Sequence, residues 1–178
     1  MKKIFILLIM LVLVVGCPQS SVFASDAEYT TRVRKEVQQV KQTNKGQQIV
    51  KAVDKYSKQY NVKPELIHAV IYVESKYDHK AKSNCNAMGL MQLMPQTYKA
   101  RGGTGNPYNI DNNICVGTKH LAGMLARYKG NEIYALASYN GGSARVDRAI
   151  KNDKPLPKDL RNYVKKVQKH KQILKEEV

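Results

Sequence analysis

The chain has 178 residues, 43% of them hydrophobic, with a formal net charge of +16 and a pI near 9.8. This length is enough for one domain with a core, and the composition is ordinary for a globular protein. The charge predicts attraction to anionic partners. The basic residues are scattered without interleaved aromatic residues, however, so the composition does not indicate a nucleic-acid-binding motif.

The N-terminus has the pattern of an export signal. Lys2 and Lys3 precede an unbroken apolar run over residues 4–15. Such a run is typical of the hydrophobic region of a signal peptide and is too short for a typical transmembrane helix. We therefore expect an exported protein of the periplasm or cell envelope, and nucleic acid is not an expected partner.

Two processing routes fit this N-terminus. Cleavage after Ala24 follows the small-x-small rule and would make residues 1–24 the signal peptide. Alternatively, residues 14–17 (VVGC) resemble a lipoprotein processing box, which would remove residues 1–16 and leave a lipidated Cys17. The only membrane contact that we expect is through this lipid anchor.

The cysteine count depends on export. Either route removes the thiol of Cys17, which leaves Cys85 and Cys115, thirty residues apart, in an oxidising compartment. A disulfide between these two is the predicted pairing, and two unpaired buried thiols are the alternative. No CxxC or HxxxH spacing indicates a metal site. The histidines do not cluster either and are interpreted as surface or helix-face residues: His68, His79, His120 and His170.

The mature chain is predicted to be mostly helical. Residues 25–48 are polar and are interpreted as a spacer or a loosely docked leader, although some of their valines share one helical face. A domain is expected over residues 49–175. Apolar residues at helical spacing, with Pro, Asn and Gly as stop signals, predict helices over residues 49–60, 64 to about 75, 95–100, 111–128, 132–138, 144–150 and 161–174. Between them we expect a loop or small hairpin at residues 76–88 and a break at residues 139–142.

Glu74 is a candidate acid–base residue. Ile67, Val70 and Ile71 precede it by seven, four and three positions, which places its carboxyl on the apolar stripe of an amphipathic helix. A carboxyl in apolar surroundings loses hydration, so its pKa is expected to rise. Such a group can hold a proton near neutral pH and donate it to a leaving group. The alternative is a Glu at the end of the helix that extends into water.

Three segments together are more specific than any one of them. Glu74-Ser75, residues 89–95 (GLMQLMP) and residues 138–142 (SYNGG) occur in an order and at spacings that resemble the soluble lytic transglycosylase family. Further matches are Asn113-Ile114 with Gly117, and residues 161–164 (RNYV). The resemblance covers roughly residues 50–170.

This resemblance implies a lysozyme-like fold that is mainly α, with at most a small β-sheet beside the catalytic helix. It implies an enzyme that cuts the glycan strand of peptidoglycan between N-acetylmuramic acid and N-acetylglucosamine without consuming water, leaving a 1,6-anhydro end. One acidic residue, matching Glu74, serves as acid and then as base, whereas most glycosidases need a pair of carboxylates. No cofactor and no metal are expected.

The family's binding residues carry over by position. Ser83 matches a serine that contacts the muramyl sugar, and Gln92 and Met94 match residues that line the sugar subsites. Tyr139 matches the tyrosine that faces the catalytic carboxyl and helps to stabilise the reacting sugar, and Asn140 matches an asparagine that orders this loop.

The sequence departs from the family pattern at two places, and two other functions also fit it. Asp159-Leu160 stands where the family has Glu-Thr, so we do not assign Asp159 the contact that the family's Glu makes. Cys85 lies in the loop that approaches residues 89–95. The rivals are a hydrolytic muramidase on the same fold and a non-catalytic wall-binding assembly component, against which the intact Glu74 argues. The expected partner is the peptidoglycan glycan strand, and the small size suggests an envelope-spanning secretion or pilus machine as a further partner.

Overall fold

The structure is a computed structural model that describes residues 19–175. The predicted signal-peptide run at residues 4–15 and the possible lipid anchor at Cys17 lie outside the described residues. In chain order the described helices are α1 Gln19–Lys41, α2 Asn44–Tyr60, α3 Pro64–Ser75, α4 Pro95–Ala100, α5 Ile110–Arg127, α6 Glu132–Gly141, α7 Ser143–Lys151 and α8 Lys158–Leu174. Within this range the β structure is limited to single bridges that join Met88 to Lys82 and to Leu93. The predicted mainly helical fold is therefore confirmed.

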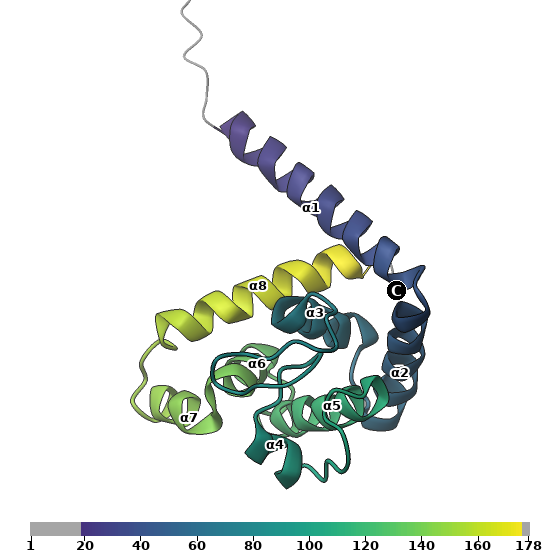
Figure 1. Ribbon diagram of the computed structural model, residues 1–178. Helices are drawn as coiled ribbons and strands as arrows, with labels where there is room; N and C mark the ends of the chain where they lie inside the picture. Colours follow the sequence, from purple (N-terminus) through teal and green to yellow (C-terminus); the bar gives the residue numbers. More distant parts are fainter. Residues whose placement is uncertain (1–18, 176–178) are drawn as a thin grey trace, which may run out of the picture.

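Helix α3 lies at the centre of the molecule, beneath α8 and beside α2 (Figure 1). Its residues from Leu66 to Tyr72 are all buried, so this helix is enclosed on every side. Ile67, Val70 and Ile71 have no exposed surface, and burial of each side chain stabilises the fold by roughly 1.5–3 kcal/mol. The helix that carries Glu74 is therefore held rigidly by the core.

Local sequence signals set the helix ends. The side chains of Thr43, Asn109 and Asn131 cap α2, α5 and α6, each accepting a hydrogen bond at 2.9–3.1 Å from the backbone N–H three residues further on. Such caps bond N–H groups that have no partner within the helix, and each cap stabilises the fold by about 1 kcal/mol. Helix α3 ends at Ser75, and its C-cap Lys76 has a left-handed backbone with φ of 50°. The chain therefore turns sharply just after Glu74.

Most of the stretch at residues 25–48 is helical, in α1 and in the start of α2. Helix α1 runs to Lys41, and its Val33 and Val37 are buried in the same core as the rest of the chain. Tyr72 of α3 donates a hydrogen bond to Glu36 Oε2 at 2.5 Å. The shared valine face noted in the sequence thus packs against the domain. Where the domain begins, and where the mature chain starts, stay predictions.

The predicted disulfide between Cys85 and Cys115 is wrong in this structure, where both are free cysteines. Cys85 is exposed at a tight turn that Ser83 and Ala87 close through a backbone hydrogen bond of 3.0 Å. Cys115 lies on α5, and its Sγ is 3.5 Å from the Tyr60 hydroxyl of α2. Each thiol thus lies in its own local contacts, and the pairing inferred from cysteine number is not formed in this structure.

Several helix boundaries also differ from the prediction: α2 begins at Asn44 and not at residue 49, and α8 begins at Lys158 and not at residue 161. The break expected at residues 139–142 falls later, because α6 continues through Gly141. Gly142, with φ of 82°, is the only one of these residues to leave the helix, and α7 follows directly. Tyr139 and Asn140 are therefore presented from the last turn of a helix and not from a loop.

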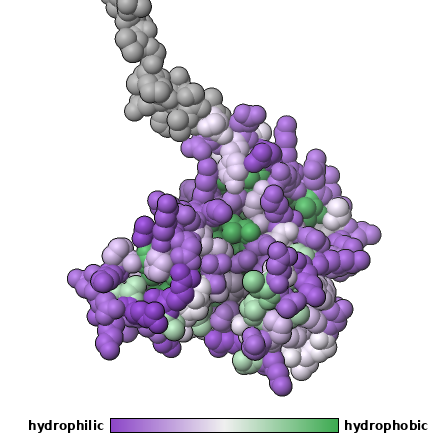
Figure 2. Space-filling view, turned by 60° about the vertical axis from the view of Figure 1, so that its left-hand side comes forward, coloured by the Kyte–Doolittle hydropathy of each residue, from purple (hydrophilic) through white to green (hydrophobic). Residues whose placement is uncertain are grey.

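The surface is mostly polar. Figure 2 shows hydrophilic residues over most of the face that it presents, with hydrophobic residues in small separate patches. Across residues 19–175, none of the helices combines the length and the apolar character that a membrane crossing requires.

Candidate active site

The predicted site residues surround one cleft of about 230 Å³. It lies where the end of α3, the loop between α3 and α4, and helices α4, α5 and α6 meet. Its lining residues are Glu74, Ser83, Ala87, Gln92, Leu93, Met94, Thr97, His120, Tyr139 and Asn140. The structure thus brings together all six residues that the sequence indicated as catalytic or sugar-binding, while their individual roles stay predictions.

Glu74 is half-buried at the end of α3, and the residues three and four positions before it, Ile71 and Val70, are completely buried. Loss of hydration raises the pKa of Glu74 from 4.5 to about 7, because burial penalises the charged form. The side chain can therefore hold or release a proton near neutral pH.

Tyr163 is the direct partner of Glu74. Its hydroxyl, which comes from α8, donates a hydrogen bond of 2.6 Å to Glu74 Oε1. This bond favours the carboxylate and limits the rise of the Glu74 pKa. Burial, followed by the charge of Glu74, holds the pKa of Tyr163 well above its usual value, so the phenol stays protonated and remains a donor.

Sequence reasoning matched Tyr163 to the family through residues 161–164 but assigned it no role. Tyr163 lies at helical spacing from Leu160, Val164 and Val167 on α8, and this spacing alone predicts only a core position. Tyr163 and Glu74 are 89 residues apart in the chain, so the signal that could have paired them is the family match and not any local pattern.

Tyr139 is held in a different way. Its hydroxyl donates to the backbone oxygen of Met91 at 2.8 Å, so this hydroxyl bonds the loop and not the Glu74 carboxyl. Burial and then the charge of Glu74 raise the pKa of Tyr139 well above its usual value. The ring thus lines the cleft that contains Glu74, while its hydroxyl holds the loop between α3 and α4.

Asn113 of α5 holds the same loop through three hydrogen bonds. Its Oδ1 accepts from Met91 N at 2.8 Å, and its Nδ2 donates to the carbonyls of Met88 at 3.0 Å and Pro107 at 2.8 Å. Gly89 has φ of 70°, and a Cβ there would lie 2.5 Å from Asn113 Nδ2. The glycine is therefore required both by its backbone conformation and by the close approach of this amide.

Gln92 and Ser83 use part of their hydrogen-bonding capacity within the loop. Gln92 Nε2 donates to the carbonyls of Ala81 at 3.1 Å and Gly89 at 2.9 Å, and neither bond uses the amide oxygen. Ser83 Oγ accepts from Ala87 N at 3.0 Å, which leaves its hydroxyl proton available to a ligand. The side-chain amide of Gln92 thus bonds backbone carbonyls of the loop between α3 and α4.

Glu74 is the one carboxyl group in the lining of this cleft. Asp78 is exposed and accepts a hydrogen bond from Lys80 N at 2.9 Å. Asp159 is exposed and binds Arg145 through two hydrogen bonds of 2.8 and 2.9 Å. The described residues also include no group of three or more His, Cys, Asp or Glu side chains arranged to hold a metal ion. The site is therefore built around a single acid.

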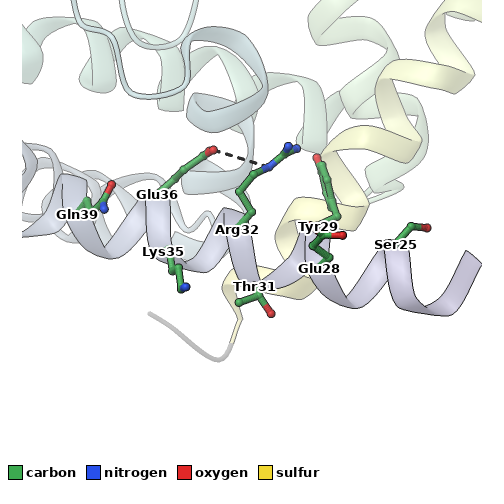
Figure 3. Close-up of a pocket in the computed structure, with 8 residues that line it drawn as sticks. All are labelled: Ser25, Glu28, Tyr29, Thr31, Arg32, Lys35, Glu36 and Gln39. Atoms are coloured by element: carbon green, nitrogen blue, oxygen red, sulfur yellow. Dashed lines mark ion pairs between the residues drawn. The ribbon is translucent and has the colours of Figure 1, made fainter. Parts of the chain in front are cut away.

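A larger groove of about 710 Å³ borders α1 and shares no lining residue with this cleft. Figure 3 shows its polar side chains along the helix, with the ion pair between Arg32 and Glu36 at 3.9 Å. Its residues are all from one helix and include no buried acid or nucleophile. We therefore regard the smaller cleft as the candidate active site.

The family model of the transglycosylase SLT domain matches residues 51–162. This is more than half of the chain, and the chain therefore belongs to the transglycosylase SLT domain family. The matched range contains every lining residue of the cleft, but it ends one residue before Tyr163.

Relatives with known descriptions agree with this family. A transglycosylase of Enterobacteria phage PRD1 is 39% identical over 106 residues, or 60% of this chain and 39% of its own length. A putative soluble lytic murein transglycosylase of Haemophilus influenzae is 35% identical over 49% of this chain and 16% of its own length. Membrane-bound lytic murein transglycosylase C of Sodalis glossinidius is 34% identical over 57% of this chain and 33% of its own length. The chain thus spans well under half the length of these relatives.

Solved structures show the same fold. The 70 kDa soluble lytic transglycosylase of Escherichia coli matches with a TM-score of 0.67 and 25% identity, over 71% of this chain and 24% of that protein. An inactive mutant of the lytic transglycosylase Slt from Pseudomonas aeruginosa matches with a TM-score of 0.64 and 26% identity, over 70% and 24%. The predicted resemblance to lytic transglycosylases is confirmed.

Proposed function

We propose that this chain is a peptidoglycan lytic transglycosylase, in which Glu74 acts first as a general acid and then as a general base. The observation that carries the proposal is a single half-buried carboxyl, with a pKa of about 7, in the lining of a cleft. Membership of the family and the names of its relatives, which include murein transglycosylases, support the substrate.

In the first step, the protonated Glu74 carboxyl donates its proton to the oxygen that links N-acetylmuramic acid to N-acetylglucosamine. The bond from this oxygen to the anomeric carbon breaks, and N-acetylglucosamine leaves as an alcohol. Glu74 becomes a carboxylate, which the hydroxyl of Tyr163 stabilises through its hydrogen bond of 2.6 Å.

In the second step, the muramyl 6-hydroxyl loses its proton to the Glu74 carboxylate while its oxygen bonds the anomeric carbon. This closes the 1,6-anhydro ring and restores the acid, and no water is consumed. A pKa near 7 suits both steps, because the same group must release a proton and then recover it. Ser83, Gln92, Met94, Tyr139 and Asn140 bind the sugars around this centre.

The test is muropeptide analysis of purified sacculi digested with the protein. We expect 1,6-anhydromuramyl ends from the wild type and none from Glu74→Gln, which keeps its affinity for glycan. Reducing muramic ends would identify a hydrolytic muramidase instead. Lysis by Glu74→Gln at the wild-type rate would remove Glu74 from the mechanism.

We propose further that the protein is exported to the cell envelope, where its substrate lies. The basic start and apolar run at residues 4–15 support this. Mass spectrometry of the mature N-terminus separates cleavage after Ala24 from lipidation at Cys17, and an intact Met1 in the envelope-free fraction would contradict export. A secretion or pilus machine as partner rests on the small size of the chain alone.

A further inference from the structure

His120 is a cleft residue to which no sequence motif assigns a role. It is half-buried on α5 and shares the lining of the cleft with Glu74 and Tyr139. Its ring centroid is 5.1 Å from that of Tyr139, with 38° between the ring planes. The imidazole therefore forms part of the wall that a bound sugar would contact, and the mechanism proposed above does not use it.

Arg101 determines which nitrogen of this imidazole carries the proton. Its Nε–H donates a hydrogen bond of 3.2 Å to His120 Nδ1. A guanidinium in a protein is always protonated and has no acceptor, so Nδ1 must offer a lone pair. The proton of the neutral ring is consequently on Nε2. Burial and then the charge of Arg101 lower the pKa of His120 to about 4, so the ring is neutral under the conditions in which the cleft works.

The surroundings of Arg101 suit this orienting role. Arg101 follows directly after α4, and its backbone N–H bonds Thr97 O at 3.0 Å. Its guanidinium lies against Gly123 of α5, where an added Cβ would be 3.3 Å from one terminal nitrogen. Among residues 19–175 the Arg101 side chain forms no ion pair, and its one hydrogen bond is to His120.

From this geometry we propose that His120 is a substrate-positioning residue that donates a hydrogen bond from Nε2–H to a carbonyl oxygen of the glycan substituents, and that Arg101 fixes the tautomer that makes this possible. The inference rests on the proposed function, because it takes the cleft to bind an N-acetylated glycan. A neutral donor of fixed direction suits an uncharged carbonyl, which both the N-acetyl group and the lactyl–peptide group supply.

The first test separates substrate positioning from structural support. We expect His120→Phe to raise KM for solubilised glycan strands about tenfold with kcat within twofold, since one hydrogen bond to substrate is lost. His120→Gln, whose amide N–H lies near the position of Nε2–H, should restore most of the affinity. Arg101→Met should raise KM by a smaller factor, with the thermal midpoint of each variant near that of the wild type.

The second test does not need turnover. In the Glu74→Gln protein, His120→Phe should weaken binding of N-acetylglucosamine oligomers if the acceptor is an N-acetyl carbonyl. It should weaken only muramyl strands if the acceptor is the lactyl–peptide carbonyl. Unchanged affinity for both ligands would overturn the inference. If the wild type produces no anhydro ends, the proposed function fails, and these affinities still report on His120.

The tautomer itself can be observed. Two-bond 1H–15N spectra of the intact protein at neutral pH should show His120 neutral with its proton on Nε2, and Arg101→Met should introduce the other tautomer. A proton on Nδ1 of the wild-type ring would contradict the part assigned to Arg101.

Discussion

Glu74 is subject to two opposing influences on its proton. Burial at the end of α3 favours the neutral carboxyl, and the hydrogen bond from Tyr163 favours the carboxylate. Burial is the larger of the two, so the net result is a raised pKa of about 7. In the proposed mechanism Glu74 acts first as an acid and then as a base, so both its protonated and its ionised form must be accessible, and a pKa near 7 provides both near neutral pH.

Removal of the phenol should shift this balance. We expect Tyr163→Phe to raise the Glu74 pKa by about one further unit, because a hydrogen bond to the charged form is lost. The pH at which kcat/KM declines on the basic side should therefore rise. At the same time kcat should fall, because the carboxylate formed in the first step is less stable. The pH dependence of anhydro-product formation measures both effects.

Tyr60→Phe is the matched control for this variant. Tyr60 also has a polar partner, Cys115 at 3.5 Å, but it lies on α2 outside the cleft. The control should keep the wild-type pH profile. An identical profile for Tyr163→Phe would mean that the Glu74 contact has no influence on catalysis.

The raised pKa also makes folding stability depend on pH. Below about pH 4.5 Glu74 holds its proton in both the folded and the unfolded chain, so it does not lower the free energy of unfolding. As pH rises the unfolded form ionises first, so stability falls until the folded carboxyl has also ionised, above about 7. We expect Glu74 to lower the free energy of unfolding by about 2 kcal/mol between these two pH values. A shift of one pKa unit corresponds to about 1.4 kcal/mol, and the value is reduced because Glu74 is partly exposed.

Urea unfolding at several pH values tests this expectation. Glu74→Gln should show a flatter dependence on pH than the wild type, since the amide does not titrate. Parallel curves for the two proteins would show that Glu74 is not the group whose proton is held by the fold.

At the scale of elements, the loop between α3 and α4 depends on α5. Asn113 bonds Met91 N, Met88 O and Pro107 O, and the Met91 side chain fills the space beside Gly117, where an added Cβ would lie 2.3 Å from Met91 Sδ. The residues that bind sugar in the proposed function, Gln92 and Met94, lie on a segment that one buried amide holds in place.

Asn113→Ala should therefore destabilise the protein and lower its activity. We expect a loss of about 2–4 kcal/mol, because one buried and two partly buried backbone groups lose their partner. Urea unfolding measures the loss. Asn112→Ala is the control, since Asn112 donates one side-chain hydrogen bond, of 3.3 Å, to Thr104 O near the surface. Equal unfolding midpoints for the two variants would contradict this account.

Helix α1 is a second element whose contribution can be measured. A chain that begins at Thr43 lacks α1, whereas one that begins at Ser25 keeps its buried valines. We expect the shorter chain to be less stable by about 2–4 kcal/mol, because the apolar surface that covers Val33 and Val37 becomes exposed. Thermal unfolding measures the difference.

Point variants separate packing from chain length in the same experiment. Val33→Ala should lower the unfolding midpoint, and Thr31→Ala, on the exposed face of α1, should leave it nearly unchanged. If both truncated and full chains unfold at the same temperature, residues 25–42 add no stability, which agrees with the predicted spacer over residues 25–48.

The charge of +16 acts at the scale of the whole molecule. In the proposed function the substrate carries peptide carboxylates, so part of the binding is electrostatic and is screened by salt. We expect the Glu74→Gln protein to bind sacculi severalfold more weakly when NaCl is raised from about 0.05 M to about 0.5 M. A co-sedimentation assay measures this, with an uncharged N-acetylglucosamine oligomer as the control ligand. Salt-independent binding to sacculi would mean that the charge serves solubility alone.

Much of the fold was accessible from local patterns. The helix predicted over residues 95–100 coincides with α4, and Pro64 and Pro95 mark helix starts as expected. The apolar stripe before Glu74 was predicted from spacing and is buried in the structure. These features depend on residues within a few turns of one another, which is why the sequence alone reveals them.

The rest depended on contacts between distant residues. Tyr163 meets Glu74 across 89 positions, Arg101 meets His120 across 19, and α1 docks through Glu36 and Tyr72. The absent disulfide is of the same kind, because a count of cysteines contains no information on the directions of their side chains.

The sequence by itself thus determined the helical periodicity, the placement of one carboxyl on a buried stripe and the family motifs, since each is written in short-range spacing. Only the tertiary structure decided which side chains donate hydrogen bonds to Glu74 and His120. The reason is that packing brings residues far apart in the chain to within about 3 Å of each other.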